Sequence, residues 1–175
     1  HRGCRLGITF PDIYDMQIQA IFNPTALLTK EGYRVLPEVE IPLTIDKAEM
    51  VFFKERIDRL AKETMEAFGL TFHYSTGTMI ELPRAALLAD ELAEHSAFFS
   101  FGTNDLTQTC LGFSRDDAEG KFLTHYLDSK ILKDNPFVTL DRKGVGKLMQ
   151  MAVEKGRSVR PNLLIGICGE HGGEA

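Results

Sequence analysis

The chain has 175 residues, of which 43% are hydrophobic and 26% are charged, which is enough to build and bury the core of one domain. Its net charge of −5, with the basic residues spread along the sequence, argues against a nucleic-acid partner. No apolar run approaches the ~18 residues of a membrane span, and three scattered cysteines do not make a disulfide framework. We therefore expect a cytoplasmic protein with no membrane partner, with any organelle-targeting segment lying upstream of residue 1.

Helix and strand signals alternate along the whole chain. Helices are predicted where apolar residues recur every three or four positions, and strands where short apolar or β-branched runs are bounded by turn residues. Asp46 and Glu49 match a capping box, and Gly69 is a natural stop for the helix that follows them. In chain order, we expect a helix over about 11–22, a strand over 35–43, a helix over 46–67, a strand over 72–80, a helix over 83–95, a strand over 98–102, a charged loop and a helix over 114–132, a helix through 145–156 and a strand over 162–168.

Repeated strand–helix units of this size predict an α/β fold with parallel strands and outer helices. A complete (β/α)8 TIM barrel needs ~250 residues, so we expect a partial barrel that forms a single domain over residues 1–175. A doubly wound open sheet is the alternative. The first residues have the composition of a loop after a strand, and the last ones stop just past another strand. We therefore expect the chain to be a piece of a longer protein.

Chemically useful side chains follow several strands at the point where each strand ends. They are Glu81, the run Gly102-Thr103-Asn104-Asp105, and Cys168. Because the carboxyl ends of parallel barrel strands converge on one face, we expect these groups to lie close together. Glu81 and Asp105 suit Mg²⁺, which takes oxygen ligands and typically one or two carboxylates.

The other residues of this set suit an anionic substrate. Gly102 and Thr103 would let a ligand oxygen approach backbone N–H groups. Arg2 or Arg5, in a glycine-containing loop, would hold a phosphate or carboxylate. Cys168 lies between glycines, and an ordinary thiol with a pKa of ~8.5 is protonated at neutral pH and can act as an acid.

Each of these residues also has a plainer interpretation. Glu81 could cap the next helix or pair with Arg84, and Asp105 could cap a turn. Gly102 could merely permit a tight turn, and either arginine could make a surface ion pair. Cys168 could be a buried strand residue or a thiol nucleophile. A zinc site built from Cys168 and His171 is disfavoured because no second ligand pair has the usual spacing.

Several segments together resemble the C-terminal phosphoenolpyruvate/pyruvate-binding barrel of the pyruvate, phosphate dikinases. In the order that this family shows, they are residues 1–7, 77–86, 98–108, 112–117 and 166–173. Phosphoenolpyruvate synthase and enzyme I of the sugar phosphotransferase system are similar around Asn104-Asp105. The Arg-Gly-Cys-Arg opening and the Cys-Gly-Glu-His-Gly-Gly ending favour the dikinases.

The resemblance implies Mg²⁺-dependent phosphoryl transfer between a phosphohistidine and pyruvate, which gives phosphoenolpyruvate. In the whole enzyme, ATP and phosphate would charge the histidine and yield AMP and pyrophosphate. Glu81 and Asp105 would hold Mg²⁺, Arg2 would contact the transferred phosphoryl group, and Cys168 would protonate the enolate. The substrate-binding residues implied are Arg2, Glu81, Gly102, Thr103, Asn104 and Asp105.

The resemblance also implies partners. The ATP-binding domain, the phosphohistidine domain, the first barrel strands and the last strand would lie outside residues 1–175, and the barrel would form a homodimer. The isolated chain is then not expected to run the full reaction. The alternatives are a phosphoenolpyruvate synthase-like enzyme, a non-catalytic truncated barrel that serves as an assembly module, and a different metal-dependent lyase on the same barrel.

Overall fold

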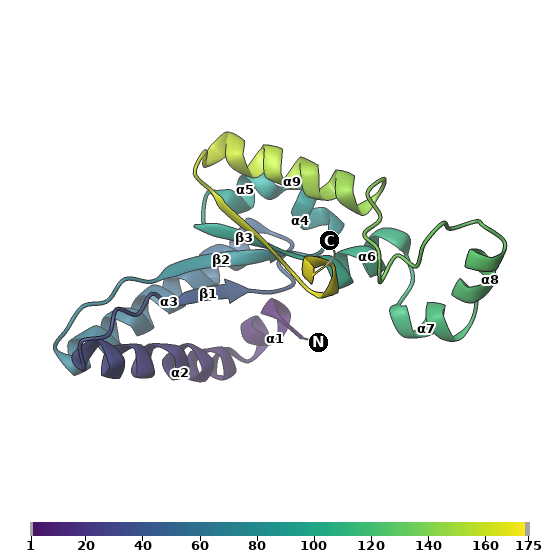
Figure 1. The fold of residues 1–175 in the computed structure, drawn as a ribbon. Coiled ribbons are helices and arrows are strands. Elements are labelled where there is room, and N and C mark those ends of the chain that lie inside the picture. The colour runs from purple at the N-terminus through teal and green to yellow at the C-terminus, as the bar shows by residue number, and fades with distance from the viewer. Residues whose placement is uncertain (1, 174–175) are drawn as a thin grey trace.

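The computed structural model of the protein describes residues 2–173, which contain one sheet of four parallel strands (Figure 1). In spatial order they are β1 (Glu38–Ile41), β2 (Ser75–Ile80), β3 (Phe98–Gly102) and β4 (Leu164–Cys168). A doubly wound sheet reverses its strand order at a switch point, and these strands follow the chain without a reversal. The expected α/β fold is confirmed, and its topology is that of a partial barrel.

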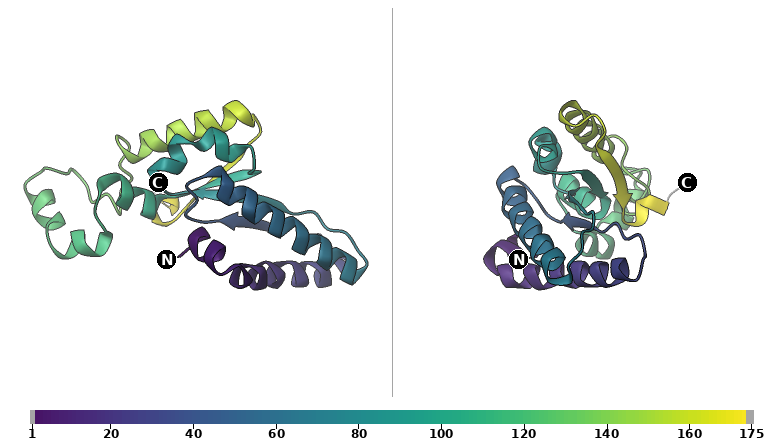
Figure 2. Two further views of the ribbon diagram at one scale, coloured as in Figure 1. Left: turned by 180° about the vertical axis from the view of Figure 1, so that it is seen from behind. Right: turned by 90° about the vertical axis from the view of Figure 1, so that its left-hand side faces the viewer.

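Helices cover one face of this sheet (Figures 1 and 2). They and the remaining helices are α1 (Cys4–Thr9), α2 (Pro11–Lys30), α3 (Lys47–Phe68), α4 (Pro83–Leu87), α5 (Ala89–Ala93), α6 (Thr103–Leu111), α7 (Arg115–Gly120), α8 (Leu123–Asp128), α9 (Val145–Val159) and the 3₁₀ turn η1 (Glu170–Gly173). Alternate strand residues such as Ile41, Ile80 and Phe101 are buried beneath the helices. None of the helices within residues 2–173 is both long and apolar enough to cross a membrane.

The long helix α3 begins and ends where the sequence predicts. The Asp46 carboxylate accepts a hydrogen bond from the Ala48 N–H at 3.0 Å, and the Glu49 carboxylate accepts one from the Asp46 N–H at 3.1 Å. Gly69 ends the helix at φ 65°, a left-handed conformation that glycine adopts without a steric penalty. The predicted capping box is confirmed.

Two of the predicted helices differ from the observed ones, and the start of the chain forms a helix that was not predicted. Helix α2 continues past Pro24 to Lys30, because Phe22 and its buried neighbours pack against α3 and tertiary packing outweighs the lost backbone hydrogen bond. The helix predicted over 83–95 is interrupted at Leu88, whose backbone leaves the helical region. Arg5 lies in the unpredicted helix α1 rather than in a loop.

Residues 113–137, called here the α7–α8 lobe, extend beyond the carboxyl ends of the strands (Figure 1). The lobe has a small apolar core that is separate from the main one. Ala118, Leu123 and Phe137 are its buried members, and Phe113 and Phe122 pack around them. The lobe therefore has an apolar core of its own, and its contacts with the rest of the molecule include hydrogen bonds from Arg115 to Gln108 and Glu170 and from His171 to Pro136.

Candidate functional site

Three of the predicted site residues meet at the carboxyl ends of β2 and β3. Glu81 directly follows β2 and is only 4% exposed. Asp105 lies in the first turn of α6, which directly follows β3. The Arg2 guanidinium donates a hydrogen bond to Asp105 Oδ1 at 2.6 Å. Residues that are far apart in the sequence are thus brought together, as the strand-end argument predicts.

The two carboxylates of this cluster influence each other. Burial raises the pKa of Glu81 to about 7; the Leu43 N–H, which donates to Glu81 Oε1 at 2.7 Å, opposes the shift. The charge of Asp105 raises this pKa further, and the charge of Arg2 lowers it. Two adjacent carboxylates with one of them desolvated form a place where a bound cation would be stabilised.

The donor set fits Mg²⁺ better than a metal that needs a full protein cage. Within residues 2–173 no group of three or more His, Cys, Asp or Glu side chains is arranged to hold a metal. Mg²⁺ typically uses only one or two carboxylates and keeps the other positions for water and substrate. Next to Asp105, the side-chain oxygen of Asn104 is buried and has no hydrogen-bond partner among the described residues. A water molecule or a ligand could therefore bind to this Asn104 oxygen.

Gly102 is required by close approach rather than by a turn conformation. Its φ of −83° is open to any residue. A Cβ at this position would lie 2.7 Å from Glu81 Oε2 and 2.7 Å from Met79 Sδ, distances that real side chains do not show. The glycine therefore leaves room for the Glu81 carboxylate.

Cys168 lies on the neighbouring strand, in register with Gly102. Its side chain is half-buried, and its thiol donates to the Phe101 carbonyl oxygen at 3.3 Å. Because paired residues of neighbouring strands share a face of the sheet, Cys168 is on the same face as Gly102, which in turn adjoins the Glu81 carboxylate. The predicted accessibility of the thiol fits this half-exposed position.

His171 contacts both the α7–α8 lobe and Thr103 at the Cys168 end of the site, a role that no pattern in the sequence clearly indicates. Its Nε2 lies 3.0 Å from the Pro136 carbonyl oxygen, and its Nδ1 lies 2.8 Å from Thr103 Oγ1. A carbonyl oxygen can only accept, so Nε2 carries a proton. Thr103 Oγ1 also lies 3.2 Å from the Cys168 carbonyl oxygen. A histidine three residues after a cysteine suggests metal binding, and only the fold reveals the contact with Thr103.

Arg115 connects the α7–α8 lobe to the turn that follows Cys168. Its Nη1 lies 2.9 Å from both carboxylate oxygens of Glu170. Its guanidinium also sits 5.7 Å from the centre of the Phe137 ring. The charged segment that the sequence identifies thus contains an ion pair between distant parts of the chain, and Asp117 pairs locally with Lys121 at 2.6 Å.

The plainer interpretation of Glu81 does not hold. Leu82, without a side-chain cap, precedes α4, so Glu81 does not cap that helix. Arg84 bonds the Ile45 carbonyl and pairs with Asp46 instead. The Glu81 carboxylate is thus free of both expected structural roles, although the Leu43 N–H occupies one of its oxygens.

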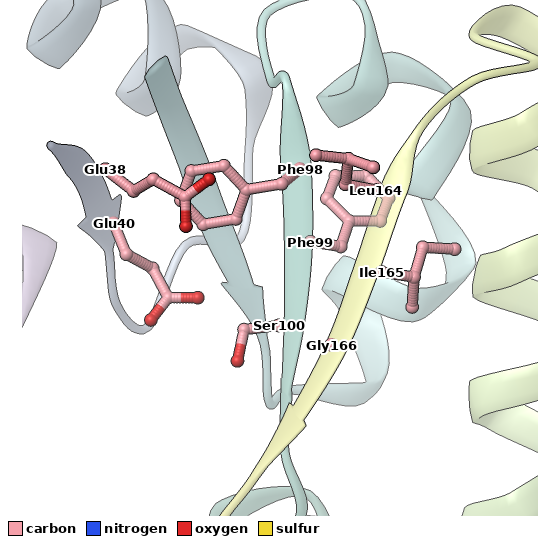
Figure 3. A pocket seen from close by; sticks show the side chains of 8 residues that line it. All are labelled: Glu38, Glu40, Phe98, Phe99, Ser100, Leu164, Ile165 and Gly166. Atoms are coloured by element: carbon pink, nitrogen blue, oxygen red, sulfur yellow. The ribbon is translucent and has the colours of Figure 1, made fainter. Parts of the chain in front are cut away.

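A cavity of about 420 Å³ lies elsewhere on the helix-free face of the sheet (Figure 3). It is lined by Glu38, Glu40, Phe98, Phe99, Ser100, Leu164, Ile165 and Gly166. These residues occupy the earlier part of the strands, whereas Glu81 and Cys168 lie at the strand ends. Burial raises the pKa of Glu40. The cavity is therefore separate from the cluster of predicted site residues.

Comparison with known proteins agrees with the geometry. All of residues 1–175 match the family described as "PEP-utilising enzyme, PEP-binding domain". The chain is 52% identical over 173 residues to pyruvate, phosphate dikinase 1, chloroplastic, of Oryza sativa subsp. japonica, covering 99% of this chain and 18% of that protein. It is 51% identical over 175 residues to pyruvate, phosphate dikinase of Clostridium symbiosum, covering 99% of this chain and 20% of that protein. The chain thus spans about a fifth of the length of these relatives.

Proposed function

Because this chain belongs to the family of PEP-utilising enzymes, as their PEP-binding domain, we propose that it forms the pyruvate and phosphoenolpyruvate site of a pyruvate, phosphate dikinase. The proposed step is Mg²⁺-dependent phosphoryl transfer between a phosphohistidine and pyruvate. The observation that carries this proposal is the buried Glu81 carboxylate beside Asp105, with the Arg2 guanidinium 2.6 Å from Asp105. The overall reaction would convert ATP, pyruvate and phosphate into AMP, phosphoenolpyruvate and pyrophosphate.

Glu81 and Asp105 would hold the Mg²⁺ ion. The ion would supply Lewis-acid stabilisation of the negative charge that develops on the substrate oxygens. The protein contributes the desolvated position of Glu81, which strengthens electrostatic interactions, and the space beside it that Gly102 leaves open. The pairing of two carboxylates supports this assignment.

Arg2 would stabilise the phosphoryl group during transfer. Its side chain is 70% exposed while its guanidinium is held against Asp105. Only one guanidinium nitrogen is used by this contact, so the remaining N–H donors can bind phosphoryl oxygens. Arg5 lies within helix α1, whereas Arg2 precedes that helix and reaches the carboxylates. Arg2 is therefore the arginine that we assign to this role.

Cys168 would transfer the proton at the methyl carbon of pyruvate. In the direction of pyruvate formation, the thiol S–H bond breaks and the proton goes to C3 of the enolate, which leaves a thiolate. In the opposite direction the thiolate takes a proton from the methyl group. The thiol is half-buried on the same sheet face as the carboxylates, which supports this role.

The proton-transfer role is tested by nuclear magnetic resonance of pyruvate in D₂O, with Mg²⁺ and the 175-residue chain. We expect the pyruvate methyl protons to exchange for deuterium faster than in protein-free buffer, and Cys168→Ala to abolish the acceleration. Cys168→Ala should also retain Mg²⁺-dependent oxalate binding. Exchange that Cys168→Ala leaves unchanged would refute the acid role, and wild-type chain that binds oxalate without accelerating exchange would favour the non-catalytic module.

The proposed partners of this domain are an ATP-binding domain and a phosphohistidine domain of the same longer protein, and a second copy of the barrel. In such a longer protein, Cys168→Ala should stop phosphoenolpyruvate formation while ATP-dependent phosphorylation of the carrier histidine continues. Loss of both reactions would place Cys168 in a structural role instead.

A further inference from the structure

We propose that Cys4 and Leu43 are positioning residues that hold Glu81 and Arg2 in their working arrangement. Neither residue would touch substrate. Cys4 binds the backbone of the segment after β1, and Leu43 in that segment binds Glu81. This inference rests on the function proposed above.

Leu43 has an unusual backbone conformation that serves a contact with Glu81. Its φ is 57°, in the left-handed region that costs a non-glycine residue roughly 1–2 kcal/mol. In this conformation its N–H donates to Glu81 Oε1 at 2.7 Å. Its side chain is only 7% exposed, so packing holds it there. The surrounding structure thus maintains a strained backbone that fixes one oxygen of a proposed metal ligand.

Cys4 binds the same segment through two hydrogen bonds. Its thiol donates to the Leu43 carbonyl oxygen at 3.1 Å, and its backbone N–H donates to the Pro42 carbonyl oxygen at 3.1 Å. Cys4 is fully buried, and burial together with the charge of Glu49 raises the pKa of its thiol to about 12. The thiol therefore stays protonated and can donate at any physiological pH.

Gly3 shows how closely the start of the chain is seated on Leu43. Its φ of 63° favours glycine, and a Cβ there would lie 2.9 to 3.1 Å from three atoms of the Leu43 side chain. The two segments are therefore packed without spare room. A side chain at Gly3 would displace Leu43, Gly3 itself or both.

The contacts of Cys4 and Leu43 affect both the proposed metal ligand Glu81 and the proposed phosphoryl-binding residue Arg2. With Oε1 of Glu81 bonded to the Leu43 N–H, Oε2, which lies near Gly102, is the oxygen left for a cation. Arg2 is two residues before Cys4, so the docking of Cys4 also sets where the Arg2 guanidinium meets Asp105. One buried thiol thus influences the metal side and the phosphoryl side together.

The test measures the dissociation constants of Mn²⁺ and of oxalate for the 175-residue chain, with Mn²⁺ followed by electron paramagnetic resonance. Cys4→Ala removes the donor and should weaken Mn²⁺-dependent oxalate binding about tenfold, which is about 1.4 kcal/mol. Cys4→Ser keeps a donor and should recover most of the loss. The matched control is Thr64→Ala, which removes a different buried donor, to the Leu60 carbonyl in α3, and should leave binding unchanged.

The outcomes separate this inference from the proposed function. Wild-type chain without Mn²⁺-dependent oxalate binding would refute the proposed function itself. Wild-type binding that Cys4→Ala leaves unchanged, or that Thr64→Ala weakens equally, would refute the positioning role alone. If Cys4→Ala does not fold, Gly3→Ala carries the test: it keeps the thiol but crowds Leu43, and we expect it to weaken oxalate binding as well. Unchanged binding in Gly3→Ala would also overturn the inference.

Discussion

The carboxylate side of the candidate site, Arg2, Glu81 and Asp105, rests on the main core, whereas the thiol side, Cys168 and the turn η1 after it, is carried by an edge strand. Glu81 is 4% exposed and follows a central strand of the sheet. In β4, by contrast, Leu164 is 64% exposed and Ile167 is 43% exposed. The thiol side is held by contacts with Thr103, His171 and the α7–α8 lobe.

Because of this difference, we expect the same kind of substitution to affect the carboxylate side and the thiol side differently. Burial and the Leu43 N–H fix Glu81, and Asp105 lies in the first turn of α6 against Arg2, so both carboxylates should move mainly when the main core is disturbed. The thiol side lies on the edge strand β4, which within residues 2–173 pairs only with β3, and contacts the α7–α8 lobe, so it should loosen through local opening while the main core stays folded. The following predictions test that separation.

The largest effect is expected from truncating a buried phenylalanine in each core. Phe53→Ala in α3 should cost about 3–5 kcal/mol and lower the melting temperature of the whole domain. Phe137→Ala should cost a similar amount within the lobe but leave the main transition nearly unchanged. Hydrogen exchange followed by mass spectrometry reports each region. Equal acceleration of exchange in α3 and α8 for Phe137→Ala would show that the two cores are one cooperative unit.

The next largest effect concerns pH. Because the folded-state pKa of Glu81 is about 7 and its ordinary value is 4.5, the folded state retains a proton that the unfolded state loses between these values. Glu81 therefore lowers stability as pH rises from 4.5 to 7, by about 3 kcal/mol in total, and the cost stays constant above pH 7.

Replacement of Glu81 by glutamine removes that cost. We expect Glu81→Gln to be more stable than wild type at pH 8 and equally stable at pH 4, as measured by urea unfolding. The same substitution should weaken Mg²⁺ binding. A stability difference that does not depend on pH would contradict the desolvated position of the Glu81 carboxylate.

A smaller effect is expected at the contact between Thr103 and His171. Thr103→Val leaves His171 Nδ1 without its partner and should cost about 1–3 kcal/mol. The matched control is Thr76→Val, because the buried Thr76 hydroxyl has no hydrogen-bond partner within residues 2–173 and its loss should be neutral or stabilising. Urea unfolding compares the two variants. Equal costs would show that the Thr103 hydroxyl contributes no specific contact.

The smallest effect is expected from Arg115→Ala. The pair with Glu170 is exposed to solvent, which screens the attraction, so its loss should barely change the free energy of unfolding. Amide hydrogen exchange in η1 and in α7 should nevertheless become faster, while amide hydrogen exchange in α3 stays the same. Unchanged exchange in η1 would show that Arg115 does not tie the lobe to the thiol side.

The sequence predicted the features that depend on local signals. The capping box of Asp46 and Glu49, the stop at Gly69 and the strand Phe98–Gly102 all appear as expected. The convergence of Glu81 and Asp105 followed from strand topology alone. Their functional assignment, and that of Cys168, stay predictions.

The features that the sequence missed depend on contacts between distant segments. No local pattern predicts the positive φ of Leu43 or its hydrogen bond with Cys4, because these two residues lie 39 positions apart in the sequence. The contact between His171 and Thr103 likewise depends on the pairing of β4 with β3, which no local pattern predicts. The break at Leu88 and the continuation past Pro24 show packing prevailing over local signals.

Calorimetric titration of oxalate tests the central claim most directly, because oxalate resembles the planar enolate of pyruvate in its two adjacent oxygens. The account predicts that the chain binds oxalate with measurable heat when Mg²⁺ is present, that chelation of the metal abolishes binding, and that Asp105→Asn weakens it at least tenfold. Binding of the same strength without Mg²⁺, or in Asp105→Asn, would contradict the metal site formed by Glu81 and Asp105.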